Sequence, residues 1–520
     1  MTPVPPRYAH TGEPRGATGR RTLVFLVLGA WLLALGWLVQ RSLYAPGREE
    51  TLARWPVPPG NSFLAIRHAD RQVGLISFTV DTLAEGMRVT ELLTIDLPQV
   101  TPKVARRTAA RIEAIYGRRF ELRGWQADLL SESGRTMSQG VVVGDTLLTV
   151  INTSRGIPPE TLTVALRRPV VLPGAVPLVI AGRGLPRVGD KANVEVYDPL
   201  DHELRIDHLT VARESTFTVP DSAIYNETLL RWSVAHLDTL RAWRVDAMVH
   251  GLPVRRWIDA TGMTVLAELP LGATVERTAF ELANTNFRAL PLPHWDDSPT
   301  APDFITPAGA GPAEPLGTRQ ILLSHARGAP LPTEVPGFIG GGQQRIGDTL
   351  RFGPTAPALD DSLLLALPPR VALTQPTADL ADQARRIIGK ETRPLFQARL
   401  LRAWVQRTIT LREDAGLSSA QRVLRARQGN AQDRVVLLAG LLQAADLPAR
   451  LCWGLLRERE RWRLHPWVES WTDGWTTLDP GEKDDAVPRA RVRLATGGRA
   501  RLLDLALLAG QLRLDLIPGP

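Results

Sequence analysis

The feature that most constrains the fold is a series of short, strand-like runs between Phe63 and about Ala283. The runs are rich in β-branched residues and alternate apolar with polar side chains, the period of a strand that places one face on a core. Such alternation indicates antiparallel strands with the other face in solvent. One interruption, Val104 to Tyr116, has apolar spacing that predicts a helix or a variable crossing segment.

A second feature is an apolar run of eighteen residues without a charge, Thr22 to Val39. At ~1.5 Å per residue, such a helix spans ~27 Å, nearly the hydrocarbon core of a bilayer. Four arginines precede the run, and the positive-inside tendency then places residues 1–21 in the cytoplasm. The rival interpretation is a cleaved signal peptide, but the run is long and no clear A-x-A site follows. We therefore expect a single-pass protein of the cell membrane whose large C-terminal part is extracytoplasmic.

Charge and cysteine content exclude several classes of function. The net charge of +8 in 520 residues comes from arginines scattered among acids rather than gathered in a stripe, so we expect no nucleic-acid partner. Cys452 is the single cysteine, which rules out an intrachain disulfide. The histidines show neither H-E-x-x-H nor Cys/His spacing, so we expect no metal and no cofactor.

Four short motifs follow one another in the last quarter of the chain. Arg427 to Arg434 (RQGNAQDR) opens an apolar helix, and Leu447 to Arg450 (LPAR), His465 to Glu469 (HPWVE) and Gly474 to Pro480 (GWTTLDP) follow. In order and spacing they resemble the core of the transglutaminase-like superfamily, with its R-x-G-D-C, G-I-P-A-R, H-x-W-x-E and G-W-x-x-x-D-P motifs. The chain is thus similar to bacterial, membrane-anchored proteins with a papain-like core.

The resemblance implies a triad from which the nucleophile is missing. In the superfamily, a cysteine at the helix N-terminus is activated by the helix dipole and by an imidazole that a carboxylate orients. Ala431 occupies the cysteine position, whereas His465 and Asp479 match the imidazole and the carboxylate as a remnant triad. Asn430 replaces the usual Asp, and Arg434 replaces a common His. Three departures in one helix turn indicate a released constraint.

Each of these residues also has a structural interpretation. Cys452 follows the LPAR motif in an expected core strand, where a buried thiol is a small hydrophobe with a raised pKa. A hydrogen bond between His465 and Asp479 can persist as a pin between two strands, which we favour over a cleft with a function. Core packing explains most of the nearby tryptophans. An aromatic groove would suit a peptide or glycan ligand, and its candidate residues are Trp462, Trp467 and Trp471.

The predicted fold class is α+β, with an N-terminal transmembrane helix, an antiparallel β-rich domain and a C-terminal papain-like transglutaminase core. Pro and Gly are dense between the two halves, where only a small β segment is expected. The expected divisions are a cytoplasmic tail (1–21), the transmembrane helix (22–39), a juxtamembrane spacer (40–58), the β-rich extracytoplasmic domain (59–285), a Pro/Gly-rich linker (286–372), the transglutaminase-like domain (373–482) and a C-terminal extension (483–520).

The resemblance and the missing thiolate together predict a pseudoenzyme. We expect a transglutaminase-like protein without catalysis that binds or scaffolds at the cell envelope, with a protein, a peptide or a glycan as ligand. The alternative is a cysteine-type amide hydrolase or transglutaminase with relocated or residual activity. A purely structural module without a ligand is the third hypothesis.

Overall fold

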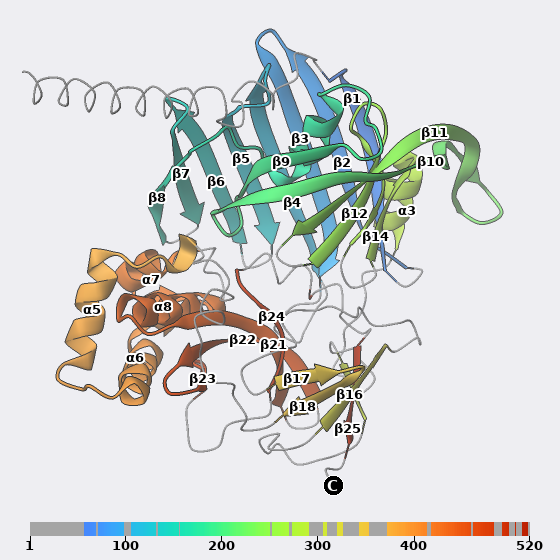
Figure 1. Cartoon of the computed structure of the whole chain (residues 1–520). Coiled ribbons are helices and arrows are strands. Elements are labelled where there is room, and N and C mark those ends of the chain that lie inside the picture. The colour runs from blue at the N-terminus through green and yellow to red at the C-terminus, as the bar shows by residue number, and fades with distance from the viewer. Residues whose placement is uncertain are drawn as a thin grey trace, which may run out of the picture. The chain divides into compact units, whose positions relative to one another are not determined.

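A computed structural model gives the fold of the chain (Figure 1). The described residues are 57–68, 71–97, 106–131, 134–154, 157–249, 252–269, 273–290, 305–308, 320–325, 343–352, 372–412, 418–458, 461–482, 491–498, 505 and 512–517.

The strands β1 to β14 form one sheet in which every neighbouring pair is antiparallel. The order runs from β8 down to β1 and continues from β14 down to β9. In this sheet, β1 and β14 are therefore the only described strands that are neighbours without being consecutive. The strands are β1 (Gly60–His68), β2 (Arg71–Leu83), β3 (Gly86–Leu97), β4 (Arg106–Gly117), β5 (Leu122–Ser131), β6 (Gly134–Val143), β7 (Leu147–Ser154), β8 (Ile157–Ala165), β9 (Lys191–Asp198), β10 (Glu203–Asn226), β11 (Arg231–Val249), β12 (Leu252–Ile258), β13 (Thr264–Glu268) and β14 (Ala273–Thr278).

Alternating side chains explain why these segments form strands. In β7, Leu148 and Val150 are fully buried, whereas Leu147 is 39% exposed, as a period of two requires. Between β8 and β9 the chain forms a short 3-10 helix, η1 (Pro173–Ala175), and the helix α2 (Val176–Ala181), whose six residues are all buried. This segment therefore packs inside the domain. The π-helical turn η3 (Glu281–Thr285) and the helix α3 (Asn286–Ala289) follow β14.

The helix or variable crossing segment predicted at Val104 to Tyr116 is wrong, because Arg106–Gly117 forms the strand β4 between β3 and β5. Ala114 and Tyr116 are buried while Ile115 between them is 37% exposed, so the burial follows the period of a strand. Two neighbouring strands satisfy the backbone hydrogen bonds of β4 on both sides, which outweighs the local preference of its alanines and arginines for a helix.

A second set of strands and the longer helices lie in the C-terminal half. The nine-stranded sheet has the order β17-β18-β16-β25-β15-β22-β21-β24, with β23 paired to β22. The strands are β15 (Ile305–Ala308), β16 (Gln320–His325), β17 (Gln343–Ile346), β18 (Thr349–Phe352), β21 (Ala449–Glu458), β22 (Arg461–Trp471), β23 (Trp475–Leu478), β24 (Arg491–Thr496) and β25 (Leu512–Ile517), and β19 (Thr410–Leu411) pairs with β20 (Gln428–Gly429). The helices are η5 (Ala372–Thr374), α5 (Ala378–Ile388), α6 (Pro394–Thr408), α7 (Ala420–Ala426) and α8 (Ala431–Ala444).

Helix α8 is the centre of the helical part, where the four orange helices of Figure 1 gather. It packs against α5, α6 and α7 and against the strands β21 and β22. Its residues Val435 to Leu442 are all buried, so the helix is apolar on every side rather than on one face. The core of this part joins α8 to Leu451, Val468 and Leu478 of the neighbouring strands. The interior position of α8 fixes its N-terminus relative to β22 and β23.

The predicted α+β class with a transmembrane helix is wrong. Strands dominate the described residues, since β4 replaces an expected helix, β10 and β11 are long, and the expected linker contributes β15 to β18. No helix in the described part of the chain is long and apolar enough to cross a membrane. The expected tail, the apolar run at 22–39 and most of the spacer lie outside the described residues, and the predicted location stays a prediction.

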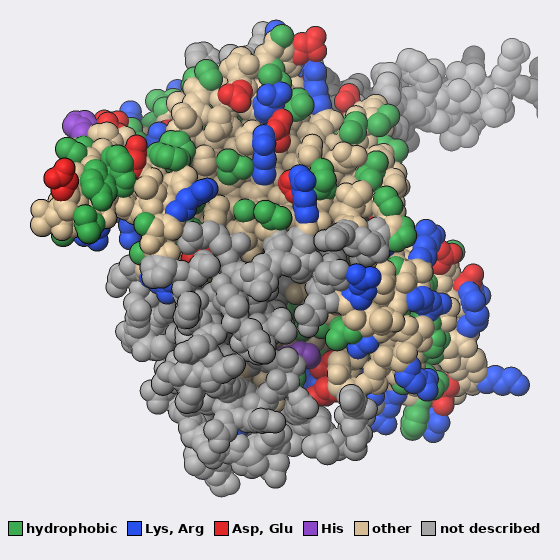
Figure 2. Space-filling view, turned by 180° about the vertical axis from the view of Figure 1, so that it is seen from behind, with side chains coloured by type: hydrophobic (Ala, Val, Ile, Leu, Met, Phe, Trp, Pro, Cys, Tyr) green, Lys and Arg blue, Asp and Glu red, His purple; other side chains and the backbone are tan. Residues whose placement is uncertain are grey.

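Charged side chains are mixed on the surface. On the face shown in Figure 2, Lys and Arg side chains are scattered among Asp and Glu over the coloured part of the chain rather than gathered in one stripe. The pattern agrees with the dispersed charge of the sequence.

Candidate functional site

The N-terminus of α8 is held by reciprocal hydrogen bonds. The side chain of Asn430 accepts a hydrogen bond of 2.9 Å from the amide of Asp433, and the Asp433 carboxylate accepts one of 3.1 Å from the amide of Asn430. Two backbone donors at the start of the helix are thus satisfied, an arrangement whose loss costs ~0.5–2 kcal/mol. Asn430, which departs from the superfamily motif, is a good capping residue.

Ala431 is the first residue of α8, directly after the cap, and its side chain is partly exposed. A helix N-terminus carries partial positive charge and stabilises an anion there. The methyl group of Ala431 has neither a lone pair nor a proton to lose. The helix therefore presents a place that suits a thiolate, with no nucleophilic atom at its first residue.

His465 and Asp479 form a buried hydrogen-bonded pair. His465 lies in β22, and Asp479 directly follows β23, the strand paired with β22. His465 Nε2 and Asp479 Oδ2 are 2.7 Å apart, and the residues are 7% and 4% exposed. The structure thus brings together the two residues that the motifs predicted as neighbours.

Several other donors surround Asp479. Arg491 of β24 donates to Oδ2 at 2.9 Å, the amide of Gly481 donates to Oδ1 at 2.7 Å, and Arg402 of α6 donates to the main-chain oxygen at 3.1 Å. Burial alone would raise the pKa of Asp479, but the hydrogen bond from His465 and the charge of Arg491 outweigh it and hold the pKa well below its ordinary value. The carboxylate therefore stays ionised.

The pair can position an imidazole and accept a proton. An ionised carboxylate only accepts hydrogen bonds, so Nε2 of His465 carries the hydrogen and Nδ1 carries the lone pair in the neutral ring. A carboxylate in this place fixes the tautomer and stabilises the imidazolium that forms after proton transfer. The geometry supplies a base with its orienting partner.

A second buried ionic cluster lies next to the pair on the same strands. Glu469 of β22 accepts hydrogen bonds from Arg493 of β24, at 2.7 and 2.6 Å, and from Arg450 of β21, at 2.9 and 2.6 Å. Burial would raise the pKa of Glu469, but the charges of Arg493 and Arg450 outweigh it and lower this pKa. The cluster satisfies a carboxylate that is 4% exposed and joins three strands.

Sequence reasoning missed this cluster. Arg450 ends the LPAR motif and Glu469 ends the HPWVE motif, so their places in two motifs were a signal that they meet across a strand pair. Arg493 lies outside every motif, and nothing local distinguishes it from the other arginines.

Cys452 lies in β21 and is fully buried, with its Sγ 3.9 Å from the main-chain oxygen of Arg450. Burial, reinforced by the nearby negative charge of Glu469, raises the pKa of the thiol far above its ordinary value. A thiol in such surroundings stays protonated and is a poor nucleophile. The structural interpretation of Cys452 is thereby favoured over a catalytic one.

The three tryptophans predicted to line a groove differ in exposure. Trp462 and Trp467 are 2% and 1% exposed, which favours core packing, whereas Trp471 is partly exposed. Trp471 packs edge-on against Trp475 at 5.6 Å between ring centroids, and the guanidinium of Arg450 lies 3.9 Å from the Trp475 centroid. The partly exposed aromatic surface therefore belongs to the β22–β23 hairpin.

A family model gives the class of the segment that contains the pair. Residues 381–480 match the family model described as the transglutaminase-like superfamily, so this segment of the chain is a transglutaminase-like domain. Both His465 and Asp479 fall within the match. A search of curated proteins found no match. Among the described residues, no group of three His, Cys, Asp or Glu side chains could hold a metal ion.

Three solved structures are similar to the chain. A candidate cysteine protease from Cytophaga hutchinsonii is 17% identical, with a TM-score of 0.23 over 39% of this chain and 81% of that protein. A β-barrel-like protein of a domain of unknown function from Brucella abortus is 12% identical, with a TM-score of 0.29 over 43% and 95%. A candidate protease from Parabacteroides distasonis is 10% identical, with a TM-score of 0.19 over 72% and 64%.

Proposed function

We propose that the transglutaminase-like domain is a binding module without catalytic activity. The observation that carries the proposal is Ala431 at the first residue of α8, in a domain that keeps the His465–Asp479 pair. Nucleophilic catalysis on an amide needs an atom that attacks the carbonyl carbon. A base and its orienting carboxylate do not replace that atom.

Relocated activity is the alternative, and Cys452 is its sole cysteine candidate. Full burial and a raised pKa argue against it, because attack requires an accessible thiolate. Cys452 also lies within the strand β21 and not at the first residue of a helix.

The ligand that fits the proposal best is a peptide or a segment of a protein. The β22–β23 hairpin offers the partly exposed Trp471 and Trp475, with Arg450 stacked on the second ring. Partly exposed aromatic rings bind extended chains through apolar contact, and the Arg450 guanidinium holds the Trp475 ring in place. A glycan, which also packs on aromatic rings, is the other outcome of a binding test.

The first experiment measures turnover by the full chain. We expect hydrolysis and transamidation of generic amide donors at the level of the buffer. The matched variant is Cys452→Ser, which removes the single thiol. Turnover by the wild-type protein that is lost in Cys452→Ser would refute the proposal and make Cys452 the nucleophile.

The second experiment restores a thiol at the vacant position. In a Cys452→Ser background, Ala431→Cys should react with iodoacetamide below pH 7 faster than a free thiol, because the helix N-terminus stabilises the thiolate. The matched control is Ala444→Cys, at the last residue of the same helix, where the helix dipole does not stabilise an anion. Equal rates for the two cysteines would show that the place no longer favours an anion.

A further inference from the structure

The strands of the fourteen-stranded sheet enclose two adjoining cavities. Their volumes are about 380 and 210 Å³. Strands β3 and β4 form one wall of the larger cavity, β10 to β12 form the opposite wall, and the segment 172–177 closes it. The smaller cavity extends between β1, β2 and β3 and the strands β12 to β14. The larger volume falls in the range of ~300–1,000 Å³ that is usual for ligand sites.

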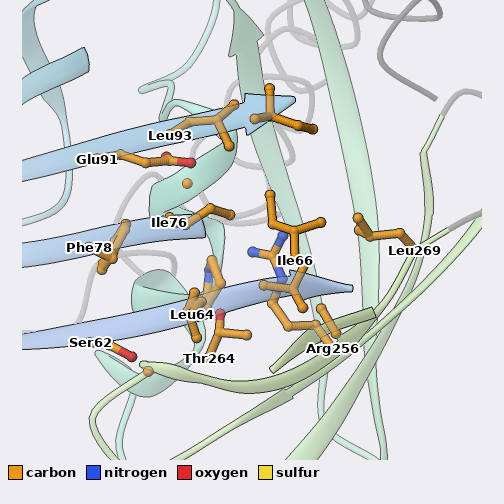
Figure 3. A pocket seen from close by; sticks show the side chains of 16 residues that line it. Ser62, Leu64, Ile66, Ile76, Phe78, Glu91, Leu93, Arg256, Thr264 and Leu269 are labelled. Atoms are coloured by element: carbon orange, nitrogen blue, oxygen red, sulfur yellow. The ribbon is translucent and has the colours of Figure 1, made fainter. Parts of the chain in front are cut away.

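The walls of both cavities are mainly apolar. Figure 3 shows aliphatic side chains from neighbouring strands pointing into the smaller cavity. Glu91, Leu93, Gly174, Pro177, Arg256 and Leu269 line both cavities, which makes the two a continuous site. Apolar walls of this kind fit a hydrocarbon chain. The apolar residues of the smaller cavity include Leu64, Ile66, Ile76, Phe78, Leu93 and Val275.

Two charged side chains lie where the cavities join. Glu91 of β3 and Arg256 of β12 are partly accessible, and among the residues that the structure describes neither forms an ion pair or a hydrogen bond. Burial raises the pKa of Glu91 and lowers that of Arg256, and the charge of each partner opposes these shifts. Arg256 can therefore donate a hydrogen bond to a ligand in the cavity, and Glu91 can accept one from it.

Gly174 makes room for the Glu91 carboxylate. A Cβ atom at this position would lie 2.3 Å from Glu91 Oε2 and 3.5 Å from the ring of Phe78. The absence of a side chain lets the carboxylate lie against the η1 backbone at the junction of the two cavities. This close packing fixes the place of the acid in an otherwise apolar wall.

The remaining charged side chains of the larger cavity are one arginine and two acids. Arg205 pairs with Asp198 at 3.2 Å and with Asp207 at 2.9 Å. With Glu91 and Arg256, the cavity holds three acids and two arginines. An anionic head group would lie among more acids than arginines in a poorly solvated place, which is unfavourable. A neutral head group that both donates and accepts matches the acid and the arginine together.

We propose that this cavity binds a neutral single-chain amphiphile. The hydrocarbon chain lies along the apolar walls, and a head group such as a primary amide accepts a hydrogen bond from Arg256 and donates one to Glu91. The site belongs to the β-rich part of the chain and does not depend on the function of the transglutaminase-like domain.

Displacement of a fluorescent probe tests the proposal on the full chain. N-Phenyl-1-naphthylamine, a neutral apolar dye, should bind with increased emission, and oleamide should displace it. Oleate and oleylamine have similar chains with an anionic or a cationic head group, and we expect both to compete at least about fivefold less well, the order that one hydrogen bond contributes. Absence of dye binding, or stronger displacement by either charged compound, would overturn the proposal.

Adjacent residues of β3 provide a matched pair of variants. Leu93 lines both cavities, whereas Leu92 points to the other face of the sheet and is 42% exposed. Leu93→Trp should fill the site and abolish dye binding, and Leu92→Trp should leave it unchanged. Circular dichroism checks that both variants fold. Equal dye binding by the two variants would place the dye elsewhere and overturn the assignment.

A separate variant tests the contact between the head group and Arg256, and this test remains valid if Leu93→Trp fails to fold. Arg256→Met replaces the guanidinium with an apolar side chain of similar shape, which cannot donate a hydrogen bond. Its affinity for oleamide should fall about fivefold, while binding of the dye is retained. Unchanged oleamide affinity would refute the role of Arg256.

Discussion

Replacement of Asp479 by asparagine tests what the buried carboxylate contributes to the transglutaminase-like domain. Its Oδ2 accepts hydrogen bonds from His465 and Arg491, and its Oδ1 accepts one from the amide of Gly481. An amide of the same shape has one oxygen and one NH2 group. In either orientation, at least one buried donor then faces another donor.

The magnitude follows from these contacts. A buried donor without an acceptor costs ~1–3 kcal/mol, and the bonds that remain lose their charge. Loss of one partner of a buried ion pair reaches ~3–5 kcal/mol only where a charge is left uncompensated. Arg491 keeps the carboxylate of Glu482 as a partner. We therefore expect Asp479→Asn to lower the free energy of unfolding by about 2–3 kcal/mol.

Hydrogen exchange of the full chain, followed by mass spectrometry, measures this free energy for the peptides of β22 and β23. The control is Asp473→Asn at an exposed turn residue with φ of 78°, a conformation that asparagine tolerates. We expect the control to lie within ~0.5 kcal/mol of the wild-type protein. A change of that size or less in Asp479→Asn would refute the role of the carboxylate.

Three further outcomes are expected. Because the pKa values of Asp479 and Glu469 are lowered on folding, the stability that they contribute is present above pH ~4 and is lost as the pH falls through the folded-state values. The free energy of unfolding measured with urea should therefore fall less steeply with decreasing pH in Asp479→Asn than in the wild-type protein. Cys452 should resist a disulfide reagent in the native protein and react once guanidinium unfolds it, and rapid native labelling would contradict its burial. Asn430→Ala should cost ~0.5–2 kcal/mol in the exchange of α8, whereas no loss would show that the capping box is not stabilising.

The motifs predicted the contact between His465 and Asp479, which the structure contains. His465 and Asp479 meet because two paired strands carry them, and pairing of neighbouring strands is visible in a chain with a short turn between them. From β24, Arg491 donates to Asp479 and Arg493 donates to Glu469, and nothing in the local sequence of β24 indicates either contact. Contacts of that kind are set by the register of a third strand.

The β-rich part shows the same limit on a larger scale. The alternating runs predicted strands, yet β4 was predicted as a helix or a variable crossing segment, because its own residues do not show its hydrogen-bonding partners. No local sequence pattern predicts the cavity. Glu91 and Arg256 lie on strands far apart in the chain, and only the curvature of the sheet brings both to one space.

The pairing of β1 with β14 has a consequence for synthesis on the ribosome. Every other neighbouring pair in the sheet joins consecutive strands, so hairpins can form as the chain emerges. β1 ends at His68 and its partner β14 begins at Ala273, about 200 residues later. At ~5–20 residues per second, the free edge of β1 waits on the order of 10–40 s for its partner. During that interval the nascent protein carries an open strand edge, the kind of surface on which chains aggregate and which a chaperone covers.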